Sequence, residues 1–481
     1  MQLNRTLQPA LSALGISTRS WPTFALMIAS DLVALSLSGV ISVYIRLFLF
    51  EEQFNPTLYW QLSPALGLFV LAYAFVGLYP GVGISPVDEL RWASLSTTLM
   101  HLALAALLLL RREGEVYDRG VFLIAWLLSI VLVLVGRALV RLLFAHKRWW
   151  GYPVIVLGAG KTGEMVIRTL HLRPNIGLKP VLVLDDNPQK HGWLHGVPVV
   201  GGVALAPELA RRRRIPYAIV AMPGVPRNQL LRLLERYATA FPHLLIIPDL
   251  FEFSSLWVAA KDMGGVLGLE VRQRLLLPGP RLTKFLIDLA ATLIGGLIIL
   301  PLIGLIAVLI RIDSPGPIFY SQLRIGQGGQ YFKAWKFRTM VKNADRALQE
   351  YLDDHPDLRE AWQKDQKLRN DPRVTRIGRF LRRTSLDELP QLWNILRGEM
   401  SLVGPRPIVD EEVERYGDKF ELYKKVIPGL TGLWQVSGRN NITYEERVSL
   451  DAYYVRNWSV WLDVYILLRT VWVVATGEGA Y

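Results

Sequence analysis

The stretch Thr384-Ser385-Leu386-Asp387-Glu388-Leu389-Pro390-Gln391 places two adjacent carboxylates directly after a segment rich in arginine. Successive residues on a helix point about 100° apart, so we expect Asp387 and Glu388 to have different roles and not to share one proton. A simpler explanation is a capping box, in which Ser385 and Glu388 only start a helix. That explanation leaves Asp387 and the neighbouring arginines without a role. The stretch therefore predicts a phosphate-handling site in the C-terminal part of the chain.

Three further blocks accompany this stretch. Lys336-Phe337-Arg338-Thr339-Met340 precedes it, and Gly404-Pro405-Arg406-Pro407 and Pro428-Gly429-Leu430-Thr431-Gly432 follow it. In their order and spacing the four blocks resemble the monotopic polyprenyl-phosphate phosphoglycosyl transferases. The resemblance implies an α/β catalytic domain over residues 281–481.

The resemblance also implies a reaction and a metal. Asp387 is expected to attack the β-phosphate of a UDP-sugar, which gives an aspartyl-phosphosugar and releases UMP. Glu388 is expected to help hold Mg²⁺ and to orient Asp387, so both carboxylates are candidate metal ligands. Undecaprenyl phosphate then attacks the same phosphorus and regenerates the aspartate.

Basic residues in and near these blocks are the candidate substrate ligands. An arginine suits phosphate because its planar fork can make two parallel hydrogen bonds. The two prolines around Arg406 fix the backbone, so its guanidinium extends from a stiff turn that the family assigns to the nucleotide end of the donor. The alternative for the strand cations is simple exposure to solvent. The candidates are Lys336, Arg338, Arg382, Arg406 and Arg439.

Composition indicates contact with a membrane. Hydrophobic residues make up 51% of the 481 residues, and there are 15 tryptophans. The formal net charge of +13 favours anionic partners such as headgroups, lipid phosphates or nucleotides, and nothing in the sequence supports nucleic acid. There is no cysteine, which excludes disulfides and thiolate chemistry.

Four apolar stretches, at residues 24–45, 58–78, 92–110 and 121–144, are each near the ~20 residues that a helix needs to cross a bilayer. We expect residues 1–147 to form a bundle of four transmembrane helices. Basic residues around the last exit predict that both ends of the bundle lie in the cytoplasm, although Arg111, Arg112 and Arg119 argue the other way. The family resemblance implies that the membrane is a bacterial inner membrane. Asp31, inside the first stretch, is expected to be buried and paired.

Residues 148–265 are typical of a Rossmann-like domain. A strand at 154–157 is followed by the glycine turn Gly158-Ala159-Gly160-Lys161-Thr162-Gly163, and a second strand at 181–184 ends at Asp185. Further strands are expected at 217–221 and 244–247. The candidate cofactor ligands are Gly158, Gly160, Gly163 and Asp185. The motif alone is weak evidence, so a regulatory role, or a fold that has lost its ligand, is favoured over nucleotide binding.

Residues 285–310 could form a fifth span. Pro301 lies near the middle, lacks the N–H for a helical hydrogen bond and clashes with the carbonyl four residues earlier, so we expect a kink or break there. Hydropathy alone leaves a kinked span open. The family resemblance implies a re-entrant hairpin over residues 282–312, which follows a linker at 266–280 and keeps the catalytic domain cytoplasmic.

Two other functions are weighed against this one. A membrane-tethered nucleotide-sugar dehydratase or epimerase would need a Tyr-x-x-x-Lys motif, which the chain lacks. A noncatalytic scaffold for polysaccharide assembly is separated from an enzyme by UMP release. The block 403–409, Arg439-Asn440 and the final Gly-Ala-Tyr most resemble members that transfer galactose 1-phosphate for O-antigen, capsule or exopolysaccharide synthesis, with glucose as the alternative. The additional domains are compatible with a homodimer.

Overall fold

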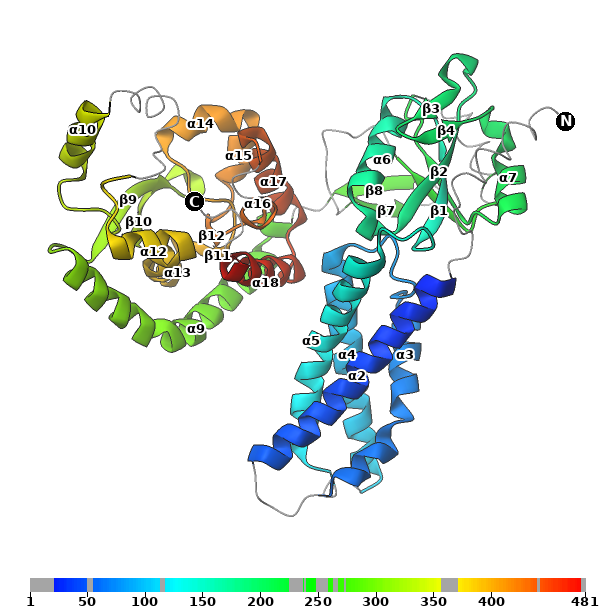
Figure 1. Ribbon diagram of the computed structural model, residues 1–481, viewed down its shortest axis with the longest axis horizontal. Coiled ribbons are helices and arrows are strands. Elements are labelled where there is room, and N and C mark those ends of the chain that lie inside the picture. The colour runs from blue at the N-terminus through cyan, green and yellow to red at the C-terminus, as the bar shows by residue number, and fades with distance from the viewer. Residues whose placement is uncertain are drawn as a thin grey trace. The chain divides into compact units, whose positions relative to one another are not determined.

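The computed structural model describes residues 21–49, 55–112, 117–224, 237, 239–247, 258–262, 267–271, 274–355, 371–438 and 442–476. These residues belong to two units, Met1–Glu252 and Phe253–Tyr481. Figure 1 shows the elements of each unit.

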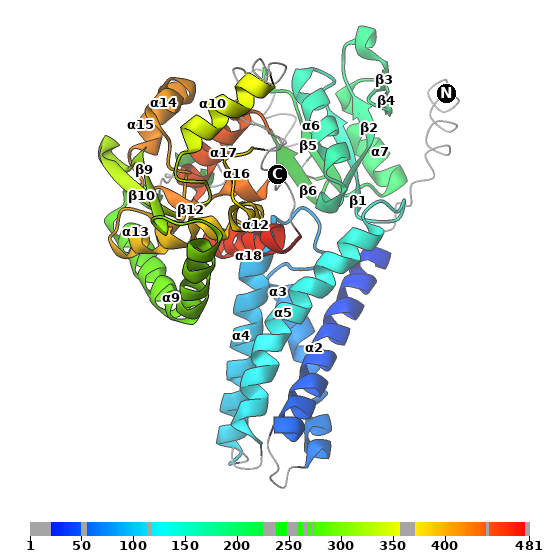
Figure 2. The same cartoon turned by 60° about the vertical axis from the view of Figure 1, so that its left-hand side comes forward.

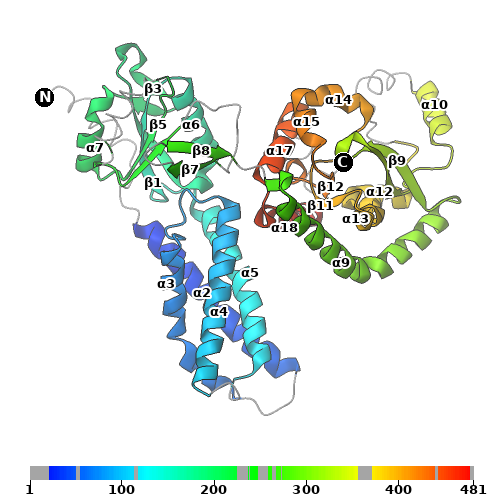
Figure 3. The same cartoon turned by 180° about the vertical axis from the view of Figure 1, so that it is seen from behind.

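Three long apolar helices of the first unit match predicted spans. They are α2 (Trp21–Leu49), α4 (Pro86–Leu110) and α5 (Arg119–Phe144), and each is long and apolar enough to cross a bilayer. Figure 3 shows them side by side in a bundle. The span predicted at 58–78 is not one continuous helix. It consists of η1 (Pro56–Leu62) and α3 (Ala65–Phe75), which meet at a 42° bend. Pro64 lies at this bend, where it lacks the N–H that a continuous helix needs.

A buried ionic network ties these helices together. Arg137 is fully buried, and its guanidinium contacts the Asp31 carboxylate at 2.6 Å and the Glu89 carboxylate at 3.1 Å. Arg141 pairs with Glu89, and the Tyr79 hydroxyl donates to Asp31 at 2.6 Å. Two arginines therefore neutralise two acids, which confirms that Asp31 is buried and paired.

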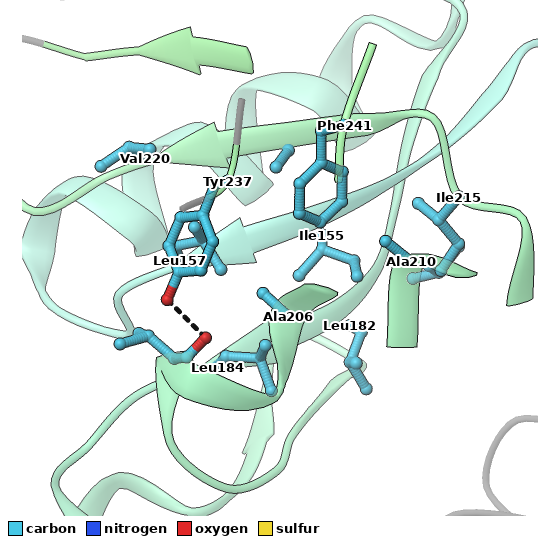
Figure 4. Close-up of a cluster of buried hydrophobic side chains, with 13 residues drawn as sticks. Ile155, Leu157, Leu182, Leu184, Ala206, Ala210, Ile215, Val220, Tyr237 and Phe241 are labelled. Atoms are coloured by element: carbon cyan, nitrogen blue, oxygen red, sulfur yellow. Dashed lines mark hydrogen bonds between the residues drawn. The ribbon is translucent and has the colours of Figure 1, made fainter. Parts of the chain in front are cut away.

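The rest of the first unit is an α/β domain with a six-stranded sheet of order β3-β4-β2-β1-β5-β6. The neighbouring pairs β4–β2, β2–β1, β1–β5 and β5–β6 are parallel, whereas β3 pairs with β4 in the antiparallel sense, which confirms the four predicted strands in a mostly parallel, Rossmann-like sheet. Apolar side chains from the sheet pack on the helix α7, and the Tyr237 hydroxyl donates to the Val203 carbonyl at 2.6 Å (Figure 4). The bounds are β1 (Tyr152–Leu157), α6 (Lys161–Leu172), β2 (Leu178–Leu184), β3 (Gly192–Leu194), β4 (Val197–Val199), α7 (Ala206–Arg213), β5 (Tyr217–Val220) and β6 (His243–Ile246).

The second unit begins with regular structure where a linker was predicted. The hairpin β7 (Val258–Asp262) and β8 (Leu267–Val271) reaches into the range 266–280, and the helix α9 (Pro278–Asp313) starts before that range ends. Most of the range 266–280, where a linker is expected, is therefore occupied by regular structure. Pairing of short strands is a long-range property that a composition shift does not reveal.

The helix α9 is hydrogen-bonded over 36 residues with Pro301 inside it, so the expected break is a bend in a continuous helix. A straight helix of this length would extend about 54 Å. Both ends nevertheless contact the same unit, since Lys284 pairs with Asp463 at 2.8 Å and Asp313 accepts from the backbone N–H of Ile377 at 2.9 Å. Figure 2 shows α9 as two limbs that meet below the domain.

The remaining elements form the α/β body above α9. The antiparallel pair β9 and β10 and the short parallel pair β11 and β12 supply its strands. Helices pack around them. The bounds are β9 (Phe319–Ile325), β10 (Tyr331–Phe337), α10 (Ala344–Asp354), α12 (Arg376–Thr384), η7 (Leu386–Gln391), α13 (Leu392–Leu396), β11 (Ser401–Val403), α14 (Asp410–Tyr416), α15 (Phe420–Tyr423), β12 (Gly429–Thr431), α16 (Leu433–Val436), α17 (Tyr444–Asn457) and α18 (Val460–Thr476).

Candidate active site

Asp387 and Glu388 lie in the first turn of the 3-10 helix η7. The preceding helix α12 ends at Ser385, which adopts a left-handed backbone conformation with φ 56°. Such a conformation is uncommon for a residue other than glycine, and it turns the chain sharply into η7. The Ser385 side chain makes no cap hydrogen bond, so the alternative capping box is not formed.

Lys336 joins the two carboxylates. Its ammonium nitrogen lies 2.6 Å from Oε1 of Glu388 and 3.9 Å from Oδ2 of Asp387. Although neighbouring residues on a helix are expected to point apart, both carboxylates lie within ion-pair distance of the same cation. Strand β10 therefore contributes the charge that lets two neighbouring carboxylates share one half-buried site.

The environment of Asp387 opposes its ionisation. Burial raises the pKa of Asp387 above its usual value, and the nearby charge of Glu388 raises it further. Lys336 and Arg382 act in the opposite direction and lower this pKa. Asp387 is thus a poorly solvated carboxylate whose ionised form depends on two neighbouring cations, as suits a nucleophile.

Arg382 extends from the last turn of α12 toward this site. Its Nε donates to Oγ1 of Thr339 at 2.9 Å, which fixes the guanidinium plane. The neighbouring Arg373 is engaged with Asp371 at 2.7 Å, so Arg382 is the member of this arginine-rich segment that influences Asp387.

The turn that carries Arg406 is braced by the block at 428–432. Strands β11 and β12 pair in parallel, and the backbone N–H of Gly429 donates to the Pro405 carbonyl at 2.8 Å. A Cβ atom on Gly429 would lie 2.0 Å from the backbone nitrogen of Gly404, so the predicted close backbone approach is confirmed. The Arg406 guanidinium carbon lies 5.9 Å from the centre of the Trp434 ring.

Arg338 has a different position from the one predicted. Strand β10 ends at Phe337, and the buried Arg338 guanidinium donates to the carbonyl oxygens of Ser314 and Pro315. It holds the turn after α9 in place and does not join the carboxylates. Arg439, the last candidate phosphate ligand, lies outside the described residues.

Three residues near the site, Arg324, Glu412 and Arg447, belong to no motif found in the sequence. Arg324 on β9 lies 3.9 Å from Glu412 on α14, and Glu412 lies 3.3 Å from Arg447 on α17. The available signal was the two-residue period of a strand: Arg324 pairs with Phe332, and Phe332 and Lys336, four residues apart, lie on the same face of the hairpin. The partner from α14 could not be read from any local pattern.

The glycine turn of the first unit is tightly packed. Gly158 has φ +105°, and Gly163 packs so closely that a Cβ atom there would lie 2.0 Å from the Gly158 carbonyl oxygen. Gly160 precedes α6 as its N-cap. The buried Asp185 carboxylate accepts from the backbone N–H of Ala159 at 2.8 Å and from Lys190 at 3.2 Å.

These contacts bring the four candidate cofactor residues together at the carboxyl ends of β1 and β2. Asp185 also accepts from the backbone N–H of Asn187 at 2.9 Å, and these hydrogen bonds lower the pKa of Asp185. Its carboxylate is therefore used within the fold, which gives the motif a structural role whether or not a nucleotide binds.

Comparisons with known proteins agree with the two-part organisation. Residues 280–477 match the family model for the bacterial sugar transferases, and residues 75–248 match a model for a CoA-binding domain.

Three relatives that match about three quarters or more of the chain are all named as transferases of a sugar or a sugar phosphate. The UDP-galactose-lipid carrier transferase of Erwinia amylovora is 38% identical over 76% of this chain and 76% of its own length. The undecaprenyl-phosphate galactose phosphotransferase of Salmonella typhimurium is 35% identical over 80% and 81%, respectively. The UDP-glucose:undecaprenyl-phosphate glucose-1-phosphate transferase of Escherichia coli is 34% identical over 74% and 76%. The resemblance inferred from the four sequence blocks is therefore confirmed, and this membrane-associated chain belongs to the bacterial sugar transferase family.

Proposed function

We propose that the chain transfers a hexose 1-phosphate from a UDP-sugar to undecaprenyl phosphate and releases UMP, as a membrane step of polysaccharide synthesis. The names of the relatives support this chemistry. The observation that carries the proposal is the position of Lys336 between Asp387 and Glu388, with Arg382 beside them. A pair of carboxylates held by cations in a half-buried site can attack phosphorus and also tolerate the charge of the phosphate oxygens.

The reaction proceeds in two displacements. In the first, an oxygen of Asp387 forms a bond to the β-phosphorus, the bond from that phosphorus to the bridging oxygen breaks, and the electron pair leaves with UMP. In the second, a phosphate oxygen of undecaprenyl phosphate forms a bond to the same phosphorus, and the bond to Asp387 breaks. Lys336 and Arg382 favour the ionised form of Asp387 before the first step, and they stabilise the same carboxylate when it leaves in the second.

The donor set fits Mg²⁺. Within the described residues there is no cluster of three histidine, aspartate or glutamate side chains that could hold a metal. Two carboxylates are sufficient for Mg²⁺, because this ion commonly binds one or two carboxylates and completes its shell with substrate phosphates and water. Asp387 and Glu388 would hold it, and the ion would supply neutralisation of charge on the phosphoryl oxygens. The ammonium of Lys336 near both carboxylates supports a preference for positive charge at this position.

UMP release tests the activity. The purified full-length chain with UDP-hexose, Mg²⁺ and undecaprenyl phosphate is expected to release UMP, with less released when the lipid is left out. A chain that binds UDP-hexose and releases no UMP with any donor would instead be the noncatalytic scaffold.

We also propose that α9 enters and leaves the membrane through its cytoplasmic face. Its two ends are attached to one unit, and its middle is apolar and exposed, with Leu297 and Ile298 both 74% exposed. An exposed apolar bend between two anchored ends is what a shallow membrane insertion requires.

The absence of cysteine makes this orientation measurable. Single substitutions Gly279→Cys, before the bend, and Glu414→Cys, in the α/β body, both replace exposed residues. An impermeant thiol reagent is expected to label neither in intact spheroplasts and both in inverted vesicles. Labelling of Glu414→Cys from outside would place the catalytic unit on the wrong side for a UDP-sugar.

We propose galactose 1-phosphate as the transferred group, with glucose 1-phosphate as the alternative, since relatives of both kinds match. Parallel measurement of kcat/KM with UDP-galactose, UDP-glucose and UDP-N-acetylhexosamines decides between them. A higher value for UDP-glucose would reassign the donor without changing the mechanism.

A further inference from the structure

Arg324 belongs to no sequence motif, and its charge interacts with that of the catalytic carboxylate Glu388. In the β9–β10 hairpin Arg324 pairs with Phe332, and Lys336 lies four residues farther along the same strand as Phe332. Residues separated by an even number on a strand point to the same face. Arg324 therefore lies on the face from which Lys336 reaches Glu388. Its side chain is 14% exposed, so it is accessible from the site and largely desolvated.

The Arg324 side chain is held by three neighbours. Its Nη2 donates to Oε1 of Gln322 at 2.8 Å, and its Nη1 donates to the carbonyl of Pro407 at 3.4 Å. Pro407 directly follows Arg406, so this contact attaches Arg324 to the rigid turn. The Glu412 carboxylate lies 3.9 Å from Arg324 and accepts from Arg447 at 3.3 Å. Glu412 thus anchors two guanidinium groups.

Positive charge is in excess around this site. Among the described side chains between the catalytic carboxylates and Glu412, the cations outnumber the acids: they are Arg324, Lys336, Arg382, Arg406 and Arg447, against Asp387, Glu388 and Glu412. Burial raises the pKa of Asp451, a further acid that interacts with Arg406 and Arg447, to about 7. Burial and the like charge of Arg406 lower the pKa of Arg324. Unbalanced charge with little solvent is unfavourable until an anion arrives. The diphosphate of a UDP-sugar carries one negative charge on each phosphate and matches this excess.

We propose that Arg324 binds the donor diphosphate together with Arg406, and that Glu412 is a positioning residue that orients Arg324 for this contact. The identity of the ligand as a UDP-sugar rests on the proposed function. Two guanidinium groups converging from β9 and from the Gly404–Pro407 turn can contact different oxygens of one diphosphate.

The test compares Arg324→Ala and Arg324→Lys with Arg415→Ala in the full-length chain. Arg415 is a matched control because it is an exposed arginine on α14 whose guanidinium lies over the Tyr444 ring, 5.2 Å from its centre. Binding of UDP is measured by calorimetry without turnover, and donor and acceptor KM values are measured by UMP release.

Arg324→Ala is expected to weaken UDP binding and raise the donor KM by at least about tenfold, as for loss of a charged hydrogen bond. The acceptor KM should stay within about twofold, Arg324→Lys should recover part of the affinity, and Arg415→Ala should match the wild type. Glu412→Gln is expected to produce a smaller increase in donor KM with kcat nearly unchanged.

UDP affinity that is equal in wild type, Arg324→Ala and Arg324→Lys would overturn the inference, provided the variants elute and melt like the wild type. If Arg324→Ala does not fold, Arg324→Lys decides, since it keeps the charge and loses the fork. A wild-type chain that binds UDP and releases no UMP would contradict the proposed function, and the binding comparison would still decide the role of Arg324.

Discussion

Asp185 is a buried aspartate and Asp387 a half-buried one, each belongs to a recognisable motif, and their surroundings differ in kind. Asp185 accepts backbone hydrogen bonds from Ala159 and Asn187, and these contacts lower its pKa. Burial raises the pKa of Asp387, and cations placed by β10 and α12 only partly offset that effect. The glycine turn uses its carboxylate to hold a loop, whereas η7 keeps its carboxylate poorly solvated and near cations.

The comparison shows that a motif can locate a carboxylate. The groups that contact this carboxylate then decide whether its role is structural or catalytic. A carboxylate already engaged by backbone N–H groups contributes to stability. A carboxylate whose partners are the side-chain cations Lys336 and Arg382 can exchange them for a substrate. Four predictions test this difference, from the largest effect to the smallest.

The same change at the two aspartates should have very different effects on turnover. Asp387→Asn is expected to lower kcat by at least about a thousandfold, because the amide cannot act as the nucleophile. Asp185→Asn should stay within about threefold of the wild type. The rate of UMP release at saturating donor and lipid measures kcat for both variants. Comparable losses of kcat would contradict the assignment of a catalytic role to Asp387 and a structural role to Asp185.

Lys336→Met removes the cation that most strongly favours ionised Asp387. We expect kcat to fall about 10²- to 10³-fold, as when a preorganised charge is lost from an active site. Since Lys336 lowers the pKa of Asp387, its removal raises that pKa, and the acid limb of the kcat/KM profile should move to higher pH. An acid limb at the wild-type position would separate Lys336 from the nucleophile.

Stability should respond with opposite signs at the two sites. The lowered pKa of Asp185 means that its ionised form stabilises the fold above the unfolded-state value of about 3.9, and this contribution is lost as pH falls through the folded-state pKa. Asp185→Asn should therefore destabilise the fold at pH 7 by about 1–3 kcal/mol, and less at low pH.

For Asp387 the raised pKa means that the stabilising form is the protonated one, and its contribution is lost as pH rises through the folded-state pKa. Asp387→Asn should leave the thermal midpoint at pH 7 unchanged or higher. Tryptophan-fluorescence melts at pH 4 and pH 7 compare the two variants, and destabilisation by both at pH 7 would refute the opposite signs.

The smallest effect is expected for Lys190, the partner of Asp185. Its side chain is 42% exposed, so Lys190→Ala should change stability by less than about 1 kcal/mol and leave UMP release within twofold. Lys336→Ala is the matched substitution at the other site. A loss of activity in Lys190→Ala comparable to that in Lys336→Ala would show that the glycine turn takes part in the reaction.

The local sequence was sufficient to predict those elements that depend mainly on interactions between residues close together in the chain. Apolar stretches predicted α2, α4 and α5, and the strand–glycine–helix pattern predicted β1 and α6. The motifs also selected Lys336, Asp387 and Glu388, which the fold brings together across 51 and 52 residues.

What the sequence could not provide depends on packing between distant elements. Arg324 acquires its position from the register of β9 against β10 and from α14, and neither is visible in a single strand. Arg338 was assigned to phosphate because it shares a block with Lys336, although the strand ends between them. Pro301 predicted a kink or a break and could not decide between them, and in the structure α9 continues through Pro301 with both of its ends anchored to the same unit.

The most direct test of the central claim is intact-mass measurement of the protein after incubation with UDP-galactose or UDP-glucose and Mg²⁺ in the absence of lipid acceptor. We expect a fraction of the wild type to gain the mass of one hexose phosphate on a peptide that contains Asp387, and to lose it when undecaprenyl phosphate is added. Asp387→Asn should show no adduct. UMP release by a wild type that never carries the adduct, or an adduct that persists in Asp387→Asn, would contradict the assignment of Asp387 as the nucleophile.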